Sequence, residues 1–376
     1  AKNSVLPILV ATLLINGVSV IHNCPMLSDV EATIKILRYL GCIVTREGHT
    51  VTVDSTNVNR NDVPDNLMRE MRSSIVFLGG ILGRMGKAVL STPGGCEIGL
   101  RPIDLHLSSM EQFGATVTTE NGFLVCSAEE KGLIGTRITL SFPSVGATEN
   151  IILAAVLAKG TTIITNAARE PEISDLADFL NRCGARIHGA GDSTVTIEGV
   201  SGLHSTEHTV IPDRIVASTY MIAAAMTNGK ICLRDIIPAH IGPTIQPLRE
   251  AGCDVTVSGR WVCLSAPPKL KRIRMIRTMP YPGFPTDVQA QMMAMTTICE
   301  GTSVIVENIF ESRFKHIGEL LRFGAKINVE GRMAVIEGVK HLNGATVRAT
   351  DLRGGSAMFL AGLNAYGTTE ITEIHH

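Results

Sequence analysis

The sequence predicts a mixed α/β (α+β) fold in which one strand–helix–strand–helix–strand–strand unit occurs six times. Three features predict this fold. A glycine followed by a β-branched run recurs about every 70 residues. A helix rich in small residues precedes each run, and a strand–turn–strand segment follows most of them. The 376 residues suffice for two domains or for one large repetitive domain.

The glycine-led runs are expected to be strands, because β-branched residues bounded by glycine are typical of strands. "NGVSVIHN" and "KGTTIITN" are two examples. The runs occupy residues 16–23, 85–92, 159–166, 228–235, 300–307 and 366–373.

The segments that follow read as a glycine helix stop, a strand, a turn and a second strand. "FGAKINVEGRMAVI" is the clearest example. Apolar residues at helical spacing precede them, as in Val30, Ile34 and Leu37, and predict a helix there. The segments occupy residues 40–53, 113–126, 183–197, 251–264 and 323–336.

The third element is a helix with alanine or glycine on many faces, which predicts close packing and burial. "DRIVASTYMIAAAM" and "DLRGGSAMFLAGL" are examples. The apolar stretch Ser4–Ile21 is the first such helix running into a strand. Pro7, Asn16 and Gly17 interrupt it, so we favour this interpretation over a membrane or signal segment.

The six copies are expected to form two domains, 1–211 and 212–376, with the boundary at Pro212. The count of elements is uneven. We expect the strand before the first helix, and the last helix–strand–turn–strand segment, to be absent, and both would belong to the second domain. The sequence is therefore interpreted as a fragment of a longer chain.

Bulk composition excludes several classes of protein. A net charge of −1 provides no field that would attract nucleic acid or an anionic membrane. The nine cysteines are odd in number and include no Cys-x-x-Cys pair, which argues against a disulfide framework and a zinc site. We expect reduced thiols in a soluble, cytoplasmic protein.

Polar residues gather at the starts of the small-residue helices. Ser144, Asp213 and Asp351 are interpreted as helix caps. Capping does not explain the cations Lys2, Arg72, Arg214 and Arg353, because a cation opposes the helix dipole at an N-terminus. Several such starts in one cleft would bind a ligand that carries phosphate or carboxylate groups.

Three further residues allow two interpretations each. Asp287, after three prolines, is either a helix cap or a base that takes a proton from an attacking hydroxyl. Arg313 is either another anion contact or a solvated charge. Cys96 lies in the Pro-Gly-Gly loop "STPGGCEIGLRP", near Arg101, and is either a reactive thiol or an incidental loop residue.

Eight motifs, spread in order over the whole chain, resemble the UDP-N-acetylglucosamine 1-carboxyvinyltransferases, the enolpyruvyl transferases of bacterial peptidoglycan synthesis. The motifs are "AKNSVLPIL", "GGCEIGLRPIDLH", "SVGATENI", "NAAREPEISDL", "PDRI", "GFPTDVQAQ", "ENIFESRF" and "TDLRGG". The resemblance implies two inside-out α/β barrel domains of three βαβαββ units each, with ligands between them. It implies transfer of the enolpyruvyl group of phosphoenolpyruvate to the 3′-hydroxyl of UDP-N-acetylglucosamine with release of phosphate, and neither a metal nor an organic cofactor.

The resemblance also implies residue roles. Cys96 would protonate the methylene carbon of phosphoenolpyruvate, and Asp287 would be the base for the sugar hydroxyl. Lys2 would contact the phosphate. Cys96 would also be the residue that the inhibitor fosfomycin alkylates. The remaining substrate contacts would be Asn3, Arg72, Arg101, Pro102, Ile103, Asp104, Leu105, Ser144, Val145, Gly146, Ile309, Arg313 and Arg353.

Two departures from the family pattern bear on these roles. Some members have a lysine where Phe142 stands, and the family continues beyond His376 into a segment with another substrate-binding arginine. Two alternatives remain open. One is the related enzyme 5-enolpyruvylshikimate-3-phosphate synthase, and the other is a noncatalytic or incomplete protein that binds a UDP-sugar.

Overall fold

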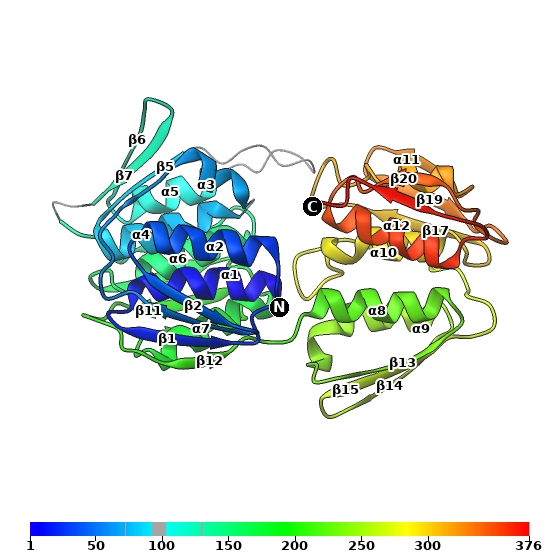
Figure 1. Ribbon diagram of the computed structural model, residues 1–376, viewed down its shortest axis with the longest axis horizontal. Coiled ribbons are helices and arrows are strands. Elements are labelled where there is room, and N and C mark those ends of the chain that lie inside the picture. The colour runs from blue at the N-terminus through cyan, green and yellow to red at the C-terminus, as the bar shows by residue number, and fades with distance from the viewer. Residues whose placement is uncertain (72, 92–102, 129–130, 376) are drawn as a thin grey trace. The chain divides into compact units, whose positions relative to one another are not determined.

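The computed structural model describes residues 1–71, 73–91, 103–128 and 131–375 (Figure 1). These residues form two compact units, one within residues 1–211 and one from Pro212 onward. Each unit has its own hydrophobic core. In both units strands and helices alternate along the chain as the repeat predicts, so the expected mixed α/β fold is confirmed.

The first unit consists of helices wrapped by three four-stranded sheets. Its helices are α1 (Lys2–Ala11), η1 (Thr12–Leu14), α2 (Ser28–Tyr39), α3 (Asp65–Glu70), η2 (Ser74–Val76), α4 (Phe77–Met85), α5 (Asp104–Gln112), α6 (Val145–Ala155) and α7 (Pro171–Arg182). Its strands are β1 (Val18–His22), β2 (Ile43–Glu47), β3 (Thr50–Asp54), β4 (Asp62–Val63), β5 (Lys87–Ser91), β6 (Thr116–Glu120), β7 (Phe123–Ser127), β8 (Arg137–Thr139), β9 (Thr161–Thr165), β10 (Arg186–His188), β11 (Thr194–Glu198) and β12 (Glu207–Thr209). The sheet orders are β12-β1-β3-β2, β4-β5-β7-β6 and β10-β11-β9-β8.

The sheet of the first copy has a parallel edge strand that follows the helices of the unit in the sequence. β12 pairs parallel with β1, with Val20 opposite Glu207 and His22 opposite Thr209. In the other two sheets of the unit the same position is filled by a strand that precedes its helix in the sequence. The position is filled here from the far end of the unit, which the order of elements along the chain could not reveal.

The small-residue helices α4 and α6 pack closely, as predicted, and α4 also approaches α1, where a Cβ on Gly80 would lie 2.7 Å from Val10. A Cβ on Gly79 would lie 2.3 Å from the Asn150 carbonyl oxygen of α6. A Cβ on Gly83 would lie 3.0 Å from both the Leu14 side chain and the Leu153 carbonyl. Gly79 of α4 lies against Asn150 of α6, and Gly83, one turn later, lies against Leu153. The two helices therefore run parallel and begin at the same end.

The α1 segment is a core element and not a membrane span. Every residue from Ser4 to Ala11 is buried, and the chain continues through η1 into β1, as expected. Among the residues described, no helix is long and apolar enough to cross a membrane.

The second unit repeats the plan with α8, α10 and α12 as its inner helices, which pack against one another. Its helices are α8 (Arg214–Met226), η3 (Pro238–Ile241), α9 (Gly242–Glu250), α10 (Thr286–Thr296), α11 (Ile317–Arg322) and α12 (Leu352–Asn364). Its strands are β13 (Lys230–Arg234), β14 (Asp254–Ser258), β15 (Trp261–Ser265), β16 (Ile276–Arg277), β17 (Thr302–Val306), β18 (Lys326–Glu330), β19 (Met333–Glu337), β20 (Thr346–Arg348) and β21 (Glu370–Thr372). The sheet orders are β13-β15-β14, β16-β17-β19-β18 and β20-β21.

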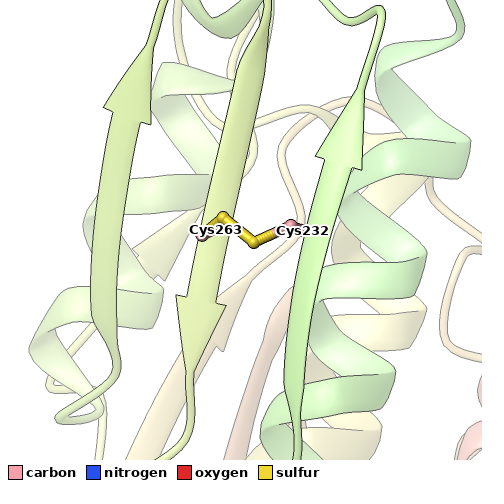
Figure 2. Close-up of a disulfide and its surroundings, with 2 residues drawn as sticks. All are labelled: Cys232 and Cys263. Atoms are coloured by element: carbon pink, nitrogen blue, oxygen red, sulfur yellow. A yellow bond between two sulfur atoms is a disulfide. The ribbon is translucent and has the colours of Figure 1, made fainter.

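One pair of cysteines contradicts the expectation that all thiols are reduced. Figure 2 shows a disulfide that joins Cys232 of β13 to Cys263 of β15. The antiparallel register places the two residues directly opposite each other, with Cα atoms 4.0 Å apart. The number and spacing of the cysteines could not predict this pair, because it depends on how two strands align. The two cysteines are 31 positions apart in the sequence.

Candidate functional site

The inner helices of the second unit bring several charged side chains to one end. The Asn364 amide at the end of α12 donates to the Met226 carbonyl at the end of α8, at 2.6 Å. The Gln291 amide of α10 donates to the Thr219 hydroxyl at the same level of α8, at 3.2 Å. All three helices therefore run parallel and begin together.

Asp287, the second residue of α10, is the centre of this cluster. Its Oδ1 atom accepts from Arg313 Nη2 at 3.0 Å and from Arg353 Nε at 3.3 Å. The side chains of Arg313 and Arg353 are 4% and 15% exposed, whereas Asp287 is 28% exposed. The structure thus rules out the solvated-charge interpretation of Arg313, and the cap of α10 is Pro285 and not Asp287.

The surroundings of Asp287 keep its carboxylate ionised. Loss of hydration raises its pKa, but the charges of Arg353, Arg313 and Arg214 outweigh that effect. The pKa of Asp287 therefore lies well below its usual range. Arg214 is buried at the start of α8, with its guanidinium 5.6 Å from the centre of the Tyr281 ring. Arg313 and Arg353 both direct N–H donors to one carboxylate, an arrangement that suits recognition of an anionic group.

The residues interpreted as helix caps do cap their helices. Asp213 accepts from the amides of Ile215 and Val216 at 2.9 and 3.0 Å. Asp351 accepts from the amides of Arg353 and Gly354 at 2.9 and 3.1 Å. These carboxylates stabilise the starts of α8 and α12, and thereby fix the backbone from which Arg214 and Arg353 extend.

Ile309 lies on the loop between β17 and α11 that also carries Arg313. Its amide donates to Glu307 Oε1 at 2.9 Å. Sequence reasoning singled out Arg313 in "ENIFESRF" and overlooked Glu307, although a glutamate that directly follows a buried strand was a signal available in the sequence.

In the first unit, Lys2 and Asn3 stand in the first turn of α1. The Lys2 ammonium lies 2.5 Å from Asp29 Oδ2 near the start of α2. Asp29 was not anticipated, because nothing in its local sequence distinguishes it from an ordinary residue of a first helical turn. The start of α1 is thus held by an ion pair that an anionic ligand could compete for.

The starts of α5 and α6 form a second group in the first unit. Ser144 caps α6 by accepting from the Ala147 amide at 3.3 Å, and Val145 and Gly146 form the first turn. Ile103 is the N-terminal flanking residue of α5, and Asp104 and Leu105 begin that helix. A Cβ on Gly146 would lie 3.1 Å from the His106 ring of α5, so the two starts are adjacent.

His106 joins α5 to the inner helices in a defined tautomer. Asn150 Nδ2 donates to the Ile75 carbonyl at 2.9 Å, and Asn150 Oδ1 accepts from the Gly79 amide at 2.7 Å. Asn150 Nδ2 also lies 2.7 Å from His106 Nδ1, which must therefore be an acceptor, leaving the proton on Nε2. Burial lowers the pKa of His106 to about 4, consistent with this neutral form.

Four of the expected site residues, Arg72, Cys96, Arg101 and Pro102, lie outside the described residues. Six other cysteines are free and buried: Cys24, Cys42, Cys126, Cys183, Cys253 and Cys299. Burial raises their pKa values to about 11 or 12, so these thiols are not nucleophiles at neutral pH. Within the described ranges, no group of three or more His, Cys, Asp or Glu residues is placed to hold a metal ion.

The two units of α/β repeats, with charged residues at the starts of their inner helices, define a class of protein that comparison with known families identifies. The chain belongs to the EPSP synthase (3-phosphoshikimate 1-carboxyvinyltransferase) family, whose profile matches residues 1–376. It is 52% identical over 376 residues to UDP-N-acetylglucosamine 1-carboxyvinyltransferase 2 of Caldanaerobacter subterraneus subsp. tengcongensis, covering 100% of this chain and 90% of the relative. It is 51% identical over 381 residues to UDP-N-acetylglucosamine 1-carboxyvinyltransferase 1 of Symbiobacterium thermophilum, covering 100% of this chain and 86% of the relative. The family resemblance seen in the motifs is therefore confirmed.

Solved structures agree with this assignment. The enolpyruvyl transferase NikO from Streptomyces tendae is 26% identical and superposes with a TM-score of 0.89, over 100% of this chain and 89% of NikO. EPSP synthase from Acinetobacter baumannii is 18% identical with a TM-score of 0.74, over 98% of this chain and 89% of that protein, and supports the fold alone.

Proposed function

We propose that this protein transfers the enolpyruvyl group of phosphoenolpyruvate to the 3′-hydroxyl of UDP-N-acetylglucosamine and releases phosphate, a step of peptidoglycan synthesis. The observation that carries the proposal is the cluster of Asp287 with Arg313 and Arg353 at the start of α10. The high identity to carboxyvinyltransferases that act on this nucleotide sugar supports the choice of acceptor substrate.

Arg313 and Arg353 would bind the carboxylate of phosphoenolpyruvate. A guanidinium recognises a carboxylate through two parallel hydrogen bonds, and here both groups are already turned toward one carboxylate. As the arginines transfer their hydrogen bonds to the substrate, their hold on Asp287 weakens and its pKa rises. Asp287 then becomes a base of useful strength for the sugar hydroxyl.

The reaction requires protons to move on both sides of one carbon. Cys96 would donate a proton to the methylene carbon, which makes the neighbouring carbon electrophilic. The sugar oxygen then bonds to that carbon while its proton passes to Asp287. Phosphate then leaves with the proton held by Asp287, and one methyl proton returns to the Cys96 thiolate, which restores the double bond. Lys2 would stabilise the departing phosphate.

The first unit would bind the nucleotide sugar. Ser144, Val145 and Gly146 begin α6, where free amides and the helix dipole favour a diphosphate. Ile103, Asp104 and Leu105 at the adjacent start of α5 would contact the same ligand, and Ile309 of the second unit would contact it as well. Asn3, beside Lys2, would contact phosphoenolpyruvate. Arg72, Arg101 and Pro102 are assigned to the substrates by family resemblance alone.

We also propose a cytoplasmic location and covalent inhibition by fosfomycin at Cys96. Six unpaired thiols among the described residues are typical of a reducing compartment, with Cys232–Cys263 as the exception. No role is proposed for a metal, an organic cofactor, nucleic acid or a membrane.

The test is phosphate release from phosphoenolpyruvate, measured with and without UDP-N-acetylglucosamine. Release that requires the nucleotide sugar and is lost in Asp287→Asn supports the proposal. Release that does not depend on the nucleotide sugar would refute it.

A further inference from the structure

Glu307 is a buried carboxylate that gathers hydrogen bonds from three segments of the second unit. Its side chain is 1% exposed. Oε1 accepts from the Thr278 hydroxyl at 2.9 Å and from the amides of Ile309 and Phe310 at 2.9 and 3.1 Å. The Thr286 hydroxyl donates to both carboxylate oxygens, at 3.2 and 3.1 Å.

These bonds connect the residue before Asp287 to the loop that carries Arg313. Thr286 is the first residue of α10 and immediately precedes Asp287. Glu307 begins the segment that leads through Ile309 to Arg313, whose guanidinium closes the ring by binding Asp287 at 3.0 Å. Thr278 contributes a second tie, because its hydroxyl also accepts from the Asn308 amide at 2.8 Å.

Each of these hydrogen bonds is donated to Glu307, so its carboxylate functions here as an acceptor. Hydrogen bonds to an ionised acceptor are roughly twice as strong as those between neutral groups. If Glu307 served only to fix the turn of the loop, its bonds to the Ile309 and Phe310 amides would be sufficient. The bond to Thr286 is superfluous for that purpose, and it fixes the distance between the loop and the start of α10.

We propose that Glu307 is a positioning residue that holds Asp287 and Arg313 in their reactive arrangement. The inference rests on the proposed function, because the role of Asp287 as a base comes from it. Glu307 touches neither substrate in this account. It acts through Thr286 on one side and through the 308–313 loop on the other.

Two variants separate positioning from mere stability. Glu307→Gln keeps the size of the side chain and weakens every bond. We expect at least 10-fold faster hydrogen–deuterium exchange at the Ile309 and Phe310 amides, and at least a 10-fold loss of kcat/KM. Thr286→Val removes only the hydrogen bond between Glu307 and the start of α10. It should lower kcat at least 10-fold, while hydrogen–deuterium exchange at the Ile309 and Phe310 amides stays as in the wild type.

Glu337→Gln is the matched control. Glu337 is an exposed glutamate in β19, which pairs with the strand β17 that precedes Glu307, and its carboxylate lies 3.2 Å from the Lys326 ammonium. Its replacement should leave both exchange and kcat/KM unchanged. A Thr286→Val protein with wild-type kcat, or a Glu307→Gln protein with wild-type exchange, would overturn the inference. A wild-type protein without turnover would refute the proposed function, whereas the exchange rates test separately whether Glu307 holds the 308–313 loop.

Discussion

Replacing Asp287 with asparagine should weaken both the folded protein and the reaction. The substitution keeps the shape of the side chain and removes the negative charge between Arg313 and Arg353, which lie 3.0 and 3.3 Å away. Removing one partner of a fully buried ion pair costs about 3–5 kcal/mol, and an exposed pair contributes about 0–1 kcal/mol.

The exposure of Arg313 and Asp287 places the energetic cost between these two limits. Arg313 is 4% exposed and would be left as a buried charge, whereas Asp287 is 28% exposed and partly hydrated. We therefore expect a loss of about 2 kcal/mol in the free energy of unfolding, which corresponds to a fall of about 4–8 °C in Tm. Loss of a general base should in addition lower kcat by about 10² to 10⁴.

Thermal unfolding and steady-state kinetics on the same preparation test both parts. A matched control is Asp254→Asn at the exposed start of β14, which should change neither quantity. If Asp287→Asn were more stable than the wild type and retained its kcat, the ion pairs would be unimportant and the assignment of the base would be wrong.

Four further predictions follow from the structure. First, the pKa of Asp287 is lowered in the folded state, so its stabilising contribution is complete above the unfolded value of about 3.9 and disappears as pH falls through the folded value. The difference in unfolding free energy between wild type and Asp287→Asn should thus be constant from about pH 8 to 5 and narrow only below about pH 4. Urea titrations of both proteins across this range measure the difference, and a difference that vanished by pH 5 would contradict this prediction. Second, Gly79→Ala should cost about 1–3 kcal/mol, because the new Cβ would lie 2.3 Å from the Asn150 carbonyl oxygen; a denaturation midpoint equal to the wild type would show that α4 and α6 are not held this closely. Third, reduction of Cys232–Cys263, which closes a loop of 31 positions, should lower stability by up to about 3–4 kcal/mol; thiol titration should count two more thiols after reduction, and an unchanged count would refute the disulfide. Fourth, Cys96→Ser should retain the fold but lose most turnover and all alkylation by fosfomycin, as judged by intact-protein mass spectrometry; full activity without alkylation would remove Cys96 from the mechanism.

Much of the fold was predictable because the repeat is encoded locally. A glycine that ends a helix and a β-branched run that forms a strand depend on a few neighbouring residues, and both signals recur in every complete copy. The position of β12 was not predictable in this way. Its pairing with β1 joins residues almost two hundred positions apart, and residues 207–209 alone contain no signal that specifies that partner.

The site was predictable to the extent that it lies at helix starts. Arg214, Asp287 and Arg353 stand at equivalent places in successive copies, so the periodicity alone suggested that they would meet. Two of the partners that hold these residues were missed. Asp29 in the first unit pairs with Lys2, and Glu307 in the second unit binds Thr286, and both roles depend on tertiary contacts.

The most direct test of the central claim is mass spectrometry of the products formed from phosphoenolpyruvate with UDP-N-acetylglucosamine or shikimate-3-phosphate. The account predicts one enolpyruvyl group on the nucleotide sugar for each phosphate released, and no reaction with shikimate-3-phosphate. An enolpyruvyl group on shikimate-3-phosphate alone would contradict it.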